Sequence, residues 1–145
     1  NQNQFLKIVN QLNQIHDNLI ILLAGKRRQF VISELEKLGI HYVYREMVDD
    51  SVLNELYNCL DLYVVASRKE GGPQAIVECG ISKSPIISTD VGFASEILSN
   101  DSIFNMENFL DASPDVEVAY NNSKKLVIPQ GFEKYEKMFR EVILK

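Results

Sequence analysis

The chain has 145 residues, which is the length of one ordinary domain and enough to bury a hydrophobic core without disulfides or a structural metal. Hydrophobic residues make up 46% and charged residues 24% of the sequence, a balance that excludes disordered, collagen-like and disulfide-rich proteins. The net charge of −5 argues against a nucleic-acid partner and against an anionic membrane surface, since both require clustered positive charge.

The first half of the sequence alternates between helical and strand patterns. Apolar residues from Phe5 to Ile15 recur at steps of three and four, which predicts an amphipathic helix, and the apolar run that ends at Ala24 is typical of a strand buried on both faces. Gly39 stands where a helix C-cap is expected, and Asp49 offers an N-cap. The expected elements are helices over 5–15, 30–38 and 52–60, and strands over 18–24 and 41–48.

The second half continues this alternation as far as a final helix. A glycine turn over 67–73 separates an apolar strand from a helix. We expect strands over 61–67, 86–89 and 102–104, helices over 75–79, 94–98 and 132–144, and an irregular acidic stretch over 105–122. Aromatic and apolar residues from Phe132 to Phe139 form one face of the last helix, and this face is expected to pack against the domain or to dock onto a partner domain.

Strands that alternate with helices predict an α/β fold with a doubly wound, mostly parallel sheet and helices on both faces. In such sheets ligands bind beyond the carboxyl ends of the strands. The loops there are expected over 25–28, 47–50, 67–73 and 90–93. Metal binding by Asp49 and Asp50 is the weaker interpretation, because an N-cap explains the same residues.

The loop over 67–73 is the most informative of the four. Gly71 and Gly72 allow the backbone to approach a ligand closely, and the helix that follows presents free N–H groups to an anion or to sugar hydroxyls. Glu70 and Glu78 flank this turn, and each carboxylate can accept two hydrogen bonds from vicinal hydroxyls. The alternative is that both carboxylates are simply solvated surface residues.

The stretch from Asp61 to Leu98 resembles the donor-binding half of glycosyltransferase family 4. It contains Glu70-Gly71, then Glu78 eight residues after Glu70, a strand that leads to Asp90-Val91-Gly92, and a further Glu96. The resemblance implies the Rossmann-like C-terminal half of a GT-B fold. It also implies a retaining glycosyltransferase that moves a sugar from a nucleotide-diphosphate sugar to an acceptor hydroxyl.

The resemblance implies a role for each matching residue. Glu70 is the catalytic residue, which binds donor-sugar hydroxyls near the reacting carbon, and Glu78 binds the ribose. The sugar and the diphosphate contact Gly71, Gly72, Pro73 and Gln74, and the base rests near Met47, Val48 and Leu53. Neither a metal nor a cofactor is expected, and the partners are a nucleotide sugar and an acceptor that is a glycan, a lipid or a small molecule.

The sequence departs from the family pattern in two respects. Gly72-Pro73-Gln74-Ala75 replaces the usual Phe-Gly-Leu-Pro after the first Glu-Gly, and the strand and basic pair with which the family begins this domain do not precede Phe5. Lys26, Arg27 and Arg28 follow a different strand and are interpreted as a solvated helix start. We therefore expect residues 1–145 to be a single domain that lacks its first strand and the N-terminal acceptor domain.

The alternative function is a GT-B-like binding or assembly module without catalysis, which the missing basic pair favours. A flavodoxin-like signalling domain is disfavoured, because Gly25-Lys26-Arg27 is basic where such a domain carries an acidic cluster. The expected location is the cytoplasm, with the full-length protein at the inner face of the membrane as a further possibility.

Overall fold

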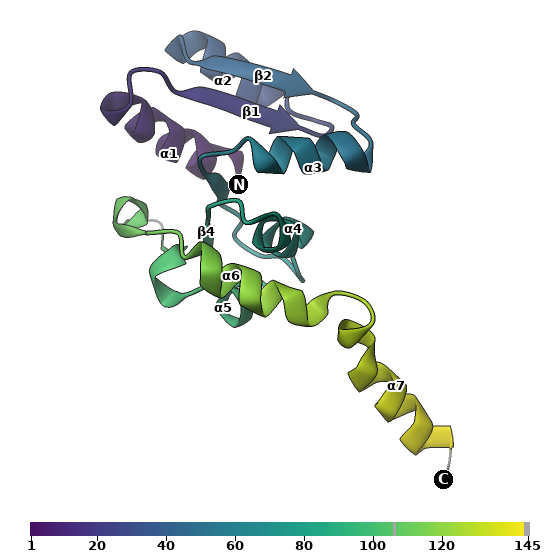
Figure 1. Ribbon diagram of the computed structural model, residues 1–145. Coiled ribbons are helices and arrows are strands. Elements are labelled where there is room, and N and C mark those ends of the chain that lie inside the picture. Colours follow the sequence, from purple (N-terminus) through teal and green to yellow (C-terminus); the bar gives the residue numbers. More distant parts are fainter. Residues whose placement is uncertain (106, 144–145) are drawn as a thin grey trace.

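The computed structural model describes residues 1–105 and 107–143, and it confirms an α/β chain in which helices and parallel strands alternate (Figure 1). The elements are α1 (Gln2–Ile15), β1 (Ile20–Ala24), α2 (Gln29–Leu38), β2 (His41–Arg45), α3 (Asp50–Asn58), β3 (Tyr63–Val65), α4 (Gln74–Ser82), β4 (Ile86–Thr89), α5 (Ala94–Ile97), η1 (Asn100–Ser102), β5 (Ile103–Phe104), η2 (Phe109–Asp111), α6 (Val116–Ser123), η3 (Lys124–Leu126) and α7 (Gln130–Ile143). Each expected strand is present, although β2 ends at Arg45 and β3 contains three residues, so both are shorter than expected.

Two helix ends follow the predicted capping residues. Gly39 closes α2 in the left-handed conformation, with a φ of 65°, which costs glycine little because it has no Cβ. Asp49 is the N-cap of α3, and its carboxylate accepts a hydrogen bond from the backbone N–H of Val52 at 2.9 Å. This bond and a further one from the Ser51 hydroxyl hold the pKa of Asp49 below its usual value. Asp49 is thus an N-cap in the structure.

The strands form two parallel sheets, although one continuous sheet was expected. β1 pairs with β2 from Ile20↔His41 to Ala24↔Arg45, and β4 lies between β3 and β5. The side of β1 away from β2 and the side of β3 away from β4 carry no further strand among the described residues. The two sheets therefore each present one free edge of backbone groups.

Helix α1 contributes to the hydrophobic clusters of both sheets. Val9 packs with Ile21 and Leu23 of β1, whereas Ile8, which is completely buried, packs with Ala66 and Ile87 of the other sheet. Neighbouring residues of one helix thus belong to different clusters. This helix joins the two halves of the domain.

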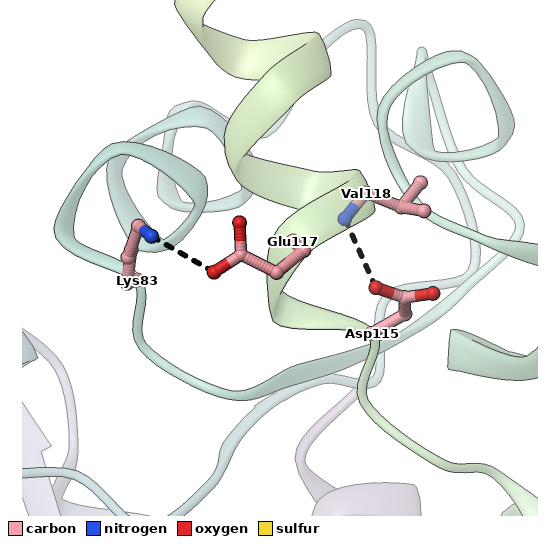
Figure 2. A network of polar contacts seen from close by, with 4 residues as sticks. All are labelled: Lys83, Asp115, Glu117 and Val118. Carbon is pink, nitrogen blue, oxygen red and sulfur yellow. Dashed lines mark hydrogen bonds and ion pairs between the residues drawn. The ribbon is translucent and has the colours of Figure 1, made fainter.

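Helix α6 covers α4 in a region where an irregular stretch was expected, so that prediction is wrong for residues 116–123. The helices approach closely at Gly80, where an added Cβ would lie 2.0 Å from the hydroxyl oxygen of the buried Ser123. At the edge of this contact Lys83 and Glu117 form an ion pair at 2.8 Å (Figure 2). Met106, which also falls in the stretch expected to be irregular, lies outside the described residues.

Helix α7 projects from the body of the domain at the C-terminal end of the chain (Figure 1). Its apolar face is exposed, from Phe132 at 58% to Ile143 at 79%, so the expected packing of this face against the domain is wrong. Leu144, the last residue of the predicted helix, lies outside the described residues. None of the helices described in residues 1–105 and 107–143 combines the length and hydrophobicity that crossing a membrane requires.

Candidate functional site

The loop that follows β3 is held from two directions. Thr89, at the end of β4, donates its hydroxyl hydrogen to the backbone carbonyl of Ser67 at 2.7 Å. The Ser67 hydroxyl in turn donates to the Glu70 carboxylate. Because strands β3 and β4 are parallel, both hydrogen bonds lie at the carboxyl end of their sheet, where α/β folds bind ligands. The structure thus places Glu70 at the expected end of the fold.

The two glycines of this loop have different surroundings. A Cβ added to Gly72 would lie 2.4 Å from a ring carbon of Phe93, in the loop after β4, whereas a Cβ on Gly71 would meet nothing within 4 Å. The backbone of Gly72 also packs against Gly92, whose φ is 57°. Gly72 is therefore needed for the contact between two loops, and Gly71 is the glycine that leaves space for a ligand.

Helix α4 begins directly after these glycines without a side-chain cap. Pro73 is its N-cap residue, one position earlier in the helix than expected, and no side chain accepts a hydrogen bond from the first turn. Proline also has no N–H of its own. The N-terminal N–H groups of a helix carry partial positive charge, so the free end of α4 favours an anion or a hydroxyl oxygen next to Gln74.

A pocket of about 880 Å³ lies beside this loop. Its wall on the β3 side is formed by Ser67, Arg68, Lys69 and Glu70. Residues 1–3 and Phe30 line it from the starts of α1 and α2. The volume is within the usual range for small-molecule sites, which is about 300–1,000 Å³. Glu70 is the predicted site residue that lines this pocket; Glu78 does not line it.

Glu78 lies in the second turn of α4 and contacts α3. The Tyr57 hydroxyl donates a hydrogen bond of 2.6 Å to one carboxylate oxygen, Oε2. Burial of the ring, followed by this bond, raises the pKa of Tyr57 well above its ordinary value, so the phenol remains a donor at physiological pH. The hydrogen bond fixes the position of Glu78 and engages only one of its two oxygens. Among the described residues, no donor is found for the other oxygen, Oε1.

The residues expected near a nucleotide base lie around the start of α3. Met47 is 72% exposed, Val48 is half-buried, and Leu53 packs against the hydrophobic cluster of the β3–β4–β5 sheet. None of these three residues lines the pocket beside Glu70. The structure therefore brings Glu70 and Gly71 together at one end of α4, while Glu78 and Leu53 lie toward α3.

The basic residues after β1 serve a local structural purpose. The Arg28 guanidinium donates from Nε to the backbone carbonyl of Ala24 at 2.9 Å, and Lys26 and Arg27 are exposed. Arg27 has a φ of 62°, and its carbonyl accepts a hydrogen bond from the Gln2 side chain at 3.4 Å. This arrangement agrees with the interpretation of the three residues as the start of a helix.

Three residues of the site escaped the sequence analysis. Phe93 packs on Gly72, Tyr57 holds Glu78, and Phe30 lines the pocket. Tyr57 and Phe30 fall in the apolar stripes of their helices, so nothing in the sequence distinguishes them from core residues. The signal that was present for Phe93 is its place directly after Gly92 in a strand-to-helix loop.

Comparison with known proteins identifies the family. The family model described as glycosyl transferases group 1 matches residues 1–140, which is nearly the whole chain. The chain therefore belongs to the glycosyl transferases of group 1, and its α/β Rossmann-like fold agrees with this assignment. No curated protein matches the chain closely enough to indicate common descent.

Proposed function

We propose that this member of the glycosyl transferases of group 1 is the donor-binding half of a retaining family 4 enzyme, which uses a nucleotide-diphosphate sugar. The observation that carries the proposal is the position of Glu70 and Gly71, between the pocket and the uncapped start of α4. The sugar bond to the diphosphate would break, the acceptor oxygen would take its place, and the nucleoside diphosphate and the hydroxyl proton would be released.

In this proposal Glu70 binds hydroxyls of the donor sugar near the reacting carbon. Its carboxylate is oriented by the Ser67 hydroxyl, which is itself fixed through the bond from Thr89 to the Ser67 backbone. Gly71 and the following residues Gly72, Pro73 and Gln74 present backbone to the sugar and the diphosphate. A preorganised carboxylate loses little entropy when a ligand binds, which favours tight recognition of the sugar.

Glu78 binds the ribose hydroxyls through its second oxygen. The Tyr57 hydroxyl occupies Oε2, so Oε1 remains available as an acceptor. Met47, Val48 and Leu53 are proposed to contact the base, on the α3 side of the same helix. The nucleotide then extends along the N-terminal half of α4. Neither a metal nor a cofactor is part of this proposal; among the described residues, no cluster of three or more His, Cys, Asp and Glu side chains is suited to hold a metal ion.

We further propose that the two sheets belong to one doubly wound domain with a central strand outside residues 1–145. The observed neighbours are β2-β1 on one side and β3-β4-β5 on the other. The common strand order 3-2-1-4-5-6 has this arrangement once its central strand is removed. The Ala24 carbonyl points away from β2, since the neighbouring Gly25 N–H bonds to Arg45, and only the Arg28 side chain occupies it. An added strand and an N-terminal acceptor domain would complete a GT-B enzyme, whose expected cytoplasmic location stays a prediction.

Titration with UDP-sugars and GDP-sugars, followed by NMR of the backbone amides, tests the donor site. We expect shifts for the amides of Glu70, Gly71 and Gln74, with weak affinity because one half of the cleft is absent. An intact protein that shows no shift with any donor at millimolar concentration would contradict the site.

A second experiment uses the full-length parent enzyme. Glu70→Gln keeps the shape of the side chain but removes its charge, and we expect transfer to fall by about 10²-fold or more, the scale seen when a group that stabilises the transition state is lost. Glu133→Gln makes the same change on the exposed surface of α7 and serves as the matched control. Activity of the Glu70 variant near that of the control would exclude Glu70 from the reacting site. A parent protein that binds donor but transfers no sugar would instead favour the non-catalytic module.

A further inference from the structure

Arg68 and Lys69 line the pocket directly before Glu70. Both side chains are exposed, and neither forms an ion pair with any carboxylate in residues 1–105 and 107–143. By contrast, Lys37, Lys83 and Arg140 each pair with a glutamate. The positive charge of Arg68 and Lys69 is therefore not neutralised by a neighbouring side chain, and it borders a cavity large enough for a nucleotide.

The same pocket side offers other donors and one opposing charge. The loop that carries Arg68 and Lys69 leads through the open position at Gly71 to the uncapped N-terminus of α4. Glu70 is the one carboxylate among the lining residues, and it accepts the Ser67 hydroxyl. Two cations against one carboxylate give this side of the pocket a net positive charge, in a chain whose total charge is −5.

We propose that Arg68 and Lys69 form the cationic pair that binds the diphosphate of the donor; this inference rests on the proposed function. An arginine can bind two phosphate oxygens at once, and a lysine adds a second point charge. When the bond between the sugar and the terminal phosphate oxygen breaks, its electron pair stays on that oxygen. The departing diphosphate therefore gains negative charge, which the two cations stabilise where they already border the pocket.

Calorimetric titration of the chain with inorganic pyrophosphate, UDP and GDP tests this pair. The variants are Arg68→Ala, Lys69→Ala and the double variant, with Lys124→Ala as a matched loss of one exposed positive charge on η3. Arg68→Lys retains the charge but not the two-pronged geometry. We expect the double variant to weaken binding of all three ligands at least tenfold, Arg68→Lys to weaken it less than Arg68→Ala, and Lys124→Ala to leave it unchanged.

The outcomes separate this inference from the proposed function. Unchanged affinity for UDP, GDP and pyrophosphate in the double variant would overturn the cationic pair and leave the nucleotide site intact. Pyrophosphate binding that depends on Arg68 and Lys69, without tighter binding of either nucleotide, would support the pair and contradict the nucleotide donor. Failure of the wild-type chain to bind any of the three ligands would overturn both. Circular dichroism of each variant verifies that the fold is retained.

Discussion

The two sheets of this domain differ in how completely they are covered. All four residues of β4, the central strand of the β3–β4–β5 sheet, are buried. In the β1–β2 sheet one face carries Ile20, which is 64% exposed, and Val43, which is 37% exposed. The loops that carry Glu70 and Phe93 both leave the covered sheet. The fold thus places its candidate chemistry on the half that is packed on both sides, whereas the other half contributes a wall of the pocket.

The largest effect that tests this comparison is expected from a core deletion. Ile76 in α4 is completely buried in the cluster of the β3–β4–β5 sheet, so Ile76→Ala should lower the free energy of unfolding by about 2–5 kcal/mol. Ile20→Ala removes the same atoms from an exposed position and should change it by less than about 0.5 kcal/mol. Urea denaturation measures both values. Equal losses would mean that the β1–β2 sheet is as well covered as the other.

Alkaline pH tests how closely the β3–β4–β5 half excludes water. Burial, with smaller contributions from neighbouring charges, raises the pKa of Tyr63 from 10.0 to about 12. A raised pKa means that the folded state holds the phenol proton more tightly, so the associated stability is complete below pH 10 and is lost as the pH rises toward 12. At about 1.4 kcal/mol per pH unit, the loss is about 2–3 kcal/mol.

Tyr63→Phe isolates this contribution. The variant should lose less stability than the wild type between pH 10 and pH 12, and the two proteins should differ by no more than about 1 kcal/mol at pH 7. Urea denaturation at a series of pH values gives both comparisons. Identical pH profiles would show that the phenol of Tyr63 is accessible to water in the folded state. The β3–β4–β5 half would then be less tightly packed than its burial indicates.

A pair of glycine substitutions tests the loops on the covered half. Gly72→Ala should cost about 1–3 kcal/mol of stability, because the new Cβ would collide with the Phe93 ring, whereas Gly71→Ala should cost less than about 0.5 kcal/mol. Under the proposed function Gly71→Ala should weaken binding of a nucleotide sugar although the fold is intact. Thermal denaturation and ligand titration separate the two effects. A destabilised Gly71 variant would mean that the open space at this position is filled by the protein itself.

Most strands and the loop of the candidate site were predictable from local sequence patterns. The apolar run that ends at Ala24 and the glycine turn at Gly71 each mark an element boundary without reference to distant residues. Glu70 could be placed at the site because parallel strands bring their carboxyl ends together. What local patterns do not contain is the partner of each side chain, so the bond from Tyr57 to Glu78 became visible only in three dimensions.

Helix α6 shows why one element could not be predicted. Its buried residues are Ala119 and Ser123, two small side chains that produce no apolar stripe. They are buried because Gly80 of α4 lets the two helices approach, and Gly80 lies 39 residues before Ala119. A helix that depends on such a contact has a weak local signal, since tertiary packing overrides the low helix propensity of its valines and asparagines.

The smallest expected effects concern how α6 is held on the covered half. Asp115 is the N-cap of α6 and accepts the backbone N–H of Val118 at 2.9 Å, while Glu117 pairs with Lys83 on the surface (Figure 2). Asp115→Ala should cost about 1 kcal/mol, because it leaves a helix N–H without its acceptor. Glu117→Gln should cost no more than about 0.5 kcal/mol, since both partners of the ion pair are largely exposed.

The dependence on salt distinguishes these two contributions in urea denaturation. The loss in Glu117→Gln should disappear at about 1 M NaCl, where surface charges are screened, whereas the loss in Asp115→Ala should largely persist. A larger effect for Glu117 than for Asp115 would mean that α6 is fixed by its surface ion pair. The close packing of α6 on Gly80 would then contribute less to the covered half than the geometry of the two helices indicates.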